Sequence, residues 1–142
     1  MGRSIIAVLA GLVIAMISIT VVQMLGHQLY DSPAGLDLND KAAIAAYMEK
    51  MPIGAMLMVL LAYVAGAFLG GLLAARLAPR KPILHAMIIG TLLFFAGIAN
   101  FVMLPHPIWF FVACVVSYFL FAYLGGLTGR RLGGKGSGVL MS

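Results

Sequence analysis

Four long uncharged runs dominate this chain, and the segments between them carry the charges. The runs extend from Ile5 to Leu25, from Ile53 to Ala75, from Ile83 to Leu104 and from Ile108 to Gly129. A helix needs about 20 residues to cross a hydrocarbon core of about 30 Å, and the runs lack the alternating polarity of barrel strands. The pattern therefore predicts transmembrane helices over residues 4–26, 52–77, 82–104 and 107–130.

The outer connection between the first two spans, residues 27–51, has signals of its own. Residues 31–35, Asp-Ser-Pro-Ala-Gly, have the chemistry of a turn. After the turn, Asn39 or Asp40 can cap a helix from Lys41 to Lys50, in which apolar residues recur at the spacing of one helical face. We expect this short amphipathic helix to lie flat on the outer membrane interface.

These elements predict an all-α integral membrane protein, a four-helix up-and-down bundle formed by residues 1–132. The short turn Pro105-His106-Pro107 makes the third and fourth spans antiparallel neighbours. Residues 133–142 are rich in Gly and Ser, which predicts a disordered cytoplasmic tail.

The composition excludes several classes of protein. Of the 142 residues, 63% are hydrophobic and 9% are charged, and the mean hydropathy is +1.11, whereas about a quarter of the residues in a soluble domain are charged. Too few cations remain to follow a nucleic-acid backbone, so no nucleic-acid partner is expected. The lone Cys114 excludes an intrachain disulfide.

Lysine and arginine are unevenly divided between the two sides of the predicted bundle. One side has seven of them, namely Arg3, Arg76, Arg80, Lys81, Arg130, Arg131 and Lys135. The outer connection has two, together with all four acidic residues. Because cytoplasmic segments carry the excess of cations, we expect both termini in the cytoplasm. The same cations favour anionic lipid headgroups.

The chain contains an internal repeat that suggests a duplicated helical hairpin. Residues 67–77 and 122–132 share seven identities in eleven positions, including both Gly-Gly pairs. Gly11 and Gly90 correspond in the odd spans, as do residues 24–27 and 103–106. Small residues let helix backbones approach closely. We expect helix packing at Gly66, Gly70, Gly71, Gly125 and Gly126, with the even spans crossing at their Gly-Gly pairs or making this contact between subunits.

Polar residues gather in the outer half of the predicted bundle. Thr20, Gln23 and His27 share one face of the first span, Asn100 lies near the outer end of the third, and His106 follows that end. Buried polar groups need partners, so these five residues form either an interhelical hydrogen-bond cluster or a ligand site. His27, Asp31 and His106 are also a candidate ligand set for zinc or, with nearby methionines, copper.

Chemistry inside the membrane has little support. None of the four uncharged runs contains Asp, Glu, Lys or Arg, whereas proton relays and ion paths usually contain such residues within the membrane. His85, about one turn from the cytoplasmic end, is expected to satisfy its hydrogen bonds locally. No catalytic motif is present, so we expect no enzyme and no cofactor beyond the candidate metal.

Two functional classes remain. We favour a structural or binding protein, either an accessory subunit of a larger membrane complex or a homo-oligomeric scaffold. The alternative is a small-solute or ion conductor acting as an oligomer, because four helices leave little room for a pore in one protomer.

Three stretches of the chain, residues 24–30, 33–37 and 100–109, resemble segments of small four-span bacterial membrane proteins. The resemblance covers nearly the whole chain. It implies a bacterial inner-membrane location and no particular activity.

Overall fold

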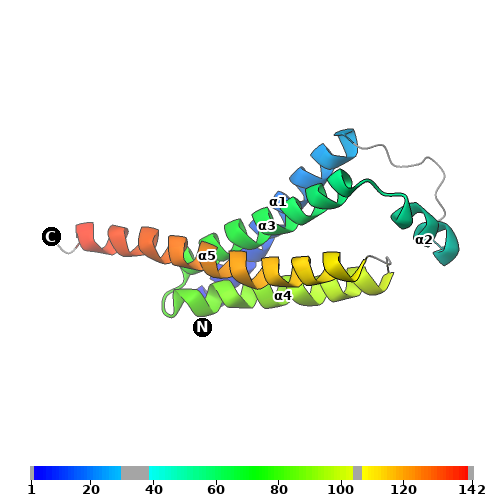
Figure 1. The fold of residues 1–142 in the computed structure, drawn as a ribbon. Coiled ribbons are helices and arrows are strands. Elements are labelled where there is room, and N and C mark those ends of the chain that lie inside the picture. Colours follow the sequence, from blue (N-terminus) through cyan, green and yellow to red (C-terminus); the bar gives the residue numbers. More distant parts are fainter. Residues whose placement is uncertain (1, 30–38, 104–106, 141–142) are drawn as a thin grey trace.

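Five helices make up the computed structural model, which describes residues 2–29, 39–103 and 107–140 and excludes the side chains of His27, Met48 and 133–140 (Figure 1). They are α1 (Gly2–Leu29), α2 (Lys41–Glu49), α3 (Ile53–Leu77), α4 (Pro82–Met103) and α5 (Ile108–Leu140). Four of them, α1, α3, α4 and α5, are long and apolar enough to cross a membrane. The predicted four-span, all-helical fold is confirmed.

Prolines set the start of three helices. Pro52 precedes α3, Pro82 opens α4, and the carbonyl of Pro107 accepts the first backbone hydrogen bonds of α5. Proline suits these positions because it has no N–H group to leave unpaired, and its fixed φ matches a helix start. Between α3 and α4, for example, the chain ends one helix at Leu77 and begins the next at Pro82.

The short helix α2 begins as the sequence predicts. Asp40 caps it, since its carboxylate oxygen Oδ1 accepts hydrogen bonds from the backbone N–H groups of Ala42 at 3.0 Å and Ala43 at 3.3 Å. Ile44, on the apolar face, is buried. In Figure 1 the helix lies beyond the N-terminal end of α3.

The last helix is longer than predicted. α5 continues to Leu140, whereas the sequence predicts a disordered tail from residue 133. Extending a helix that is already formed requires no new nucleation. Each glycine lowers the stability of the helix by about 1 kcal/mol relative to Ala, but no further nucleation cost is added.

The bundle is arranged around α3. This helix packs against α1, α4 and α5, whereas α1 and α5 do not touch each other. Figure 1 shows α1 with α3 and α4 with α5 as two pairs that converge near the N-terminus and diverge toward the other end.

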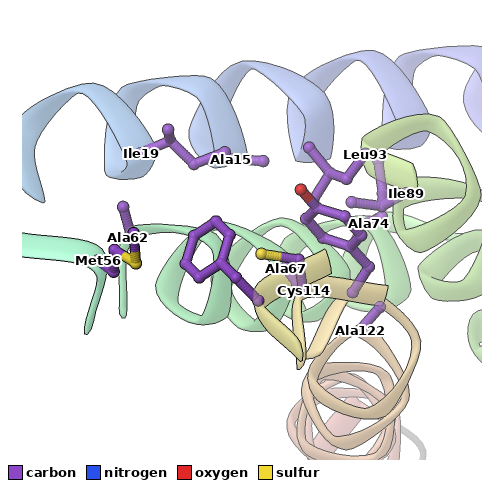
Figure 2. Close-up of a cluster of buried hydrophobic side chains, with 12 residues drawn as sticks. Ala15, Ile19, Met56, Ala62, Ala67, Ala74, Ile89, Leu93, Cys114 and Ala122 are labelled. Atoms are coloured by element: carbon purple, nitrogen blue, oxygen red, sulfur yellow. The ribbon is translucent and has the colours of Figure 1, made fainter. Parts of the chain in front are cut away.

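Adjacent small residues give α3 two packing faces. Toward α1, a Cβ atom on Gly70 would lie 2.8 Å from the Cβ atom of Ala15. Toward α5, a Cβ atom on Gly71 would lie 2.7 Å from the carbonyl oxygen of Ala122. Neighbouring residues of a helix point about 100° apart. The Gly-Gly pair thus lets two different helices approach the backbone of α3, and Figure 2 shows Ala15 and Ala122 in the cluster that results.

Candidate functional site

A hydrogen bond joins two helices in the half of the bundle that contains the start of α3 and the end of α4. Asn100 on α4 donates from its side-chain nitrogen Nδ2 to the hydroxyl oxygen of Tyr63 on α3, at 3.0 Å. The hydroxyl of Tyr63 keeps its own proton to donate, and the amide of Asn100 keeps one N–H group and its oxygen. The pair can therefore bind a further polar group.

A small pocket adjoins this pair, between α3, α4 and α5. Its walls include Tyr63, Asn100, Cys114 and Tyr118, and its volume is about 20 Å³, enough for one water molecule. Phenylalanines from α4 and α5 complete the lining. No charged side chain lines the pocket, so its chemistry suits a neutral hydrogen-bonding group rather than an ion.

Tyr118 forms a buried part of the pocket wall. Its side chain is 3% exposed, and its ring lies against that of Tyr63, with 5.4 Å between the ring centroids. Gly97 makes room for it, since a Cβ atom there would lie 2.6 Å from the Tyr118 hydroxyl oxygen. Aromatic pairs in this tilted arrangement add to the contact between helices, so α3 and α5 are joined here by rings rather than by small residues.

The structure brings together only part of the predicted polar cluster. Asn100 lines the pocket, but Thr20 is exposed, Gln23 is half-buried on α1, and α1 contributes no residue to the pocket. The side chain of His27 lies outside the described part of the chain, as do the residues Asp31 and His106. The candidate metal set therefore falls outside the described residues, among which no group of three His, Cys, Asp or Glu side chains converges.

Sequence reasoning missed Tyr63 and Tyr118, because a tyrosine within an apolar run is consistent with any membrane-spanning helix and does not stand out. A signal was nonetheless present. Tyr63 and Tyr118 are 55 residues apart, the same spacing that relates residues 67–77 to 122–132. The two tyrosines therefore have the spacing that relates these two similar segments.

Four hydroxyl groups of the spans form hydrogen bonds within their own helices. The hydroxyl groups of Ser18, Thr91, Ser117 and Thr128 each donate to the carbonyl oxygen four residues earlier. His85 bonds through Nδ1 to the carbonyl oxygen of Lys81 at 3.0 Å, as expected of a histidine that satisfies itself at the helix end.

The interhelical bond makes a testable contribution to stability. Tyr63→Phe removes the acceptor for Asn100, and interhelical hydrogen bonds in membranes are worth about 0.6 kcal/mol on average. We expect a double-mutant cycle with Asn100→Ala, read as unfolding free energy in mixed micelles, to give a coupling of about this size. Tyr123→Phe, at a side chain that is 44% exposed, is the matched control. Zero coupling would mean that the two groups do not act as a pair.

Comparison with protein-family models, with curated proteins and with solved structures found no match to this chain.

Proposed function

We propose that this protein is a structural or binding component of a bacterial inner membrane, acting as a homo-oligomeric scaffold or as an accessory subunit of a larger complex. Both termini face the cytoplasm in this proposal, because seven of the nine cations lie at that end of the spans. The protein is not proposed to be an enzyme. The pocket beside Asn100 is the proposed binding site.

The observation that carries this proposal is the close packing of the helices in the bundle. At the glycines where α3 meets α1 and α5, backbones and small side chains are in direct contact. Among the described residues, the buried polar side chains are His85 and Ser117, and each bonds within its own helix or its preceding turn. A conductor needs a continuous polar line, and these residues do not make one within a protomer.

The oligomeric state after mild extraction tests the proposal. We expect the purified protein to run as a discrete homo-oligomer or together with a larger complex. Reconstituted in vesicles, it should give no ion or small-solute flux above that of empty vesicles.

Two outcomes would contradict the proposal. A monomer without a partner would remove the scaffold and subunit roles. A flux that Asn100→Leu abolishes, with Leu61→Ala as an exposed control on α3, would instead favour the conductor, with its path at a subunit interface lined by Asn100.

A further inference from the structure

The cationic end of the bundle contains a cluster drawn from two separate parts of the chain. Arg80 and Lys81 lie in the connection between α3 and α4, and Arg130 lies on α5; all three are exposed. We call them the basic triad.

Helix packing places Arg130 beside the other two. α4 and α5 run antiparallel, and Tyr118, Ala122 and Gly126 of α5 follow one another every four residues along the face toward α4. At Gly126, a Cβ atom would lie 2.7 Å from the Cβ atom of Ala86 and 3.8 Å from the Cα atom of Ile83. Arg130 is the next residue of this row, one turn farther on. It is therefore level with the residues just before Ile83, which are those of the connection.

The backbone of the connection is fixed in place. The carbonyl oxygen of Lys81 accepts hydrogen bonds from both the backbone nitrogen of His85, at 3.3 Å, and its ring atom Nδ1, at 3.0 Å. Lys81 also has a φ of 50°, in the left-handed region that residues other than glycine rarely adopt. Such conformations persist where the surroundings impose them, and they concentrate at ligand-binding positions. The buried His85 thus orients the connection.

Within the described part of the chain, no acidic side chain lies at the end of the bundle that holds the basic triad. The acidic residues described are Asp40 and Glu49, which begin and end α2, and α2 leads into the opposite end of α3. The N-terminal end of α4 adds partial positive charge beside the triad. An anion from outside the chain is therefore strongly favoured at this point.

The depth and surroundings of the triad select a lipid as the source of that anion. Arg130 lies close to the end of the apolar stretch Ile108–Leu132, where the phosphates of a bilayer leaflet are found. Leu84 and Leu132, one turn or less from the triad in sequence, are 52% and 44% exposed, so they offer apolar surface to acyl chains.

We propose that Arg80, Lys81 and Arg130 bind the phosphate group of an anionic phospholipid. Arginine matches phosphate oxygens with a planar fork of donors, and lysine adds a compact charge. This site does not depend on the proposed scaffold or subunit role, because it would bind lipid in a protomer or in any assembly.

The test is lipid binding by the purified full-length protein in detergent, measured by native mass spectrometry with phosphatidylglycerol and phosphatidylcholine as probes. We expect a clear preference for phosphatidylglycerol. Lys81→Gln with Arg130→Gln should weaken phosphatidylglycerol binding about 25-fold, at about fivefold for each cation removed. Arg3→Gln with Arg76→Gln removes the same charge from α1 and α3, and should weaken binding less than threefold if the site is local.

Each other outcome overturns the proposal. Equal losses in the two double variants would mean a general surface potential, and equal binding of the two lipids would mean no phosphate site. Displacement of phosphatidylglycerol by millimolar inorganic phosphate would assign the site to a free anion. If the glutamine variant elutes as an aggregate, the variant Lys81→Arg with Arg130→Lys, which keeps both charges, takes its place. If that variant folds but no longer prefers phosphatidylglycerol to phosphatidylcholine, the site is not formed by charge.

Discussion

Replacing Gly125 with alanine is expected to lower the free energy of unfolding by about 3 kcal/mol. A Cβ atom at this position would meet the backbone of α3, lying 2.9 Å from the carbonyl carbon of Phe68 and 3.0 Å from the backbone nitrogen of Leu72. Overpacking costs about 1 to 3 kcal/mol, and backbone atoms cannot move aside as the end of a side chain can. We therefore expect the upper end of this range.

Unfolding by a denaturing detergent in mixed micelles, followed by far-ultraviolet circular dichroism, measures this effect. Gly26→Ala is the matched control, because a Cβ atom there would lie 3.4 Å from the Cβ atom of Met58, an ordinary van der Waals distance. Both changes raise helix propensity equally, by up to about 1 kcal/mol. If the two variants are equally stable, the backbones of α3 and α5 are not in close contact at Gly125.

The second large effect is expected at Ile89, which is fully buried on α4. Its side chain lies at the junction of three helices, since Cβ atoms on Gly11 of α1 and Gly70 of α3 would each be 3.1 Å from it. Figure 2 shows Ile89 beside Ala74 of α3. Ile89→Ala leaves a cavity that backbone contacts on either side prevent from closing. Because lipid tails are as apolar as the interior of the bundle, the lost packing is the main cost, and we expect a loss of about 2 kcal/mol, the lower end of the range for Ile to Ala.

Ile88→Ala provides the comparison for this prediction. Ile88 is the adjacent residue, 36% exposed, and the same truncation there should change the unfolding free energy by no more than about 0.5 kcal/mol. The same micelle unfolding assay applies. If Ile88→Ala is as destabilising as Ile89→Ala, then α4 faces α1 and α3 in a different orientation from the one described.

The spans and the outer helix could be predicted from the sequence because each rests on local chemistry. A run of about twenty uncharged residues in lipid must satisfy its backbone hydrogen bonds internally, which a helix does. Asp40, at the start of a segment with a helical apolar pattern, predicts a helix cap from local sequence alone. The number and order of the helices follow from such local signals. Their neighbours do not, because every span offers several apolar faces of similar character.

The two similar segments, residues 67–77 and 122–132, illustrate this difference. Gly70 and Gly125 occupy equivalent positions in them, yet Gly70 lies against α1, whereas Gly125 lies against α3. Gly71 and Gly126 show the reverse: Gly71 lies against α5 and Gly126 against α4. Sequence identity predicts that each pair makes close contacts, but not with which helix.

The polar site could be predicted only in part, because its residues follow from local sequence but its pairing of helices does not. Asn100 stood out as an amide within an apolar span, and it does bond across the bundle. Its partner comes from α3 rather than from the polar face of α1, because α1 and α4 make few contacts. A hydroxyl at the tip of an aromatic ring reaches farther than Thr20 or Gln23, and the helix pattern does not reveal that reach.

The central position of α3 has a consequence for biosynthesis. The contact partner of Gly71, Ala122, is synthesised later, because it follows Gly71 by about fifty residues. At about 5 to 20 residues per second, this interval is roughly 3 to 10 s. During that time the small-residue face of α3 toward α5 is open to lipid and to neighbouring nascent chains, while its face toward α1 can already be covered. The two glycines of one pair are thus buried at different moments of synthesis, and the fold is complete only when its last helix enters the membrane.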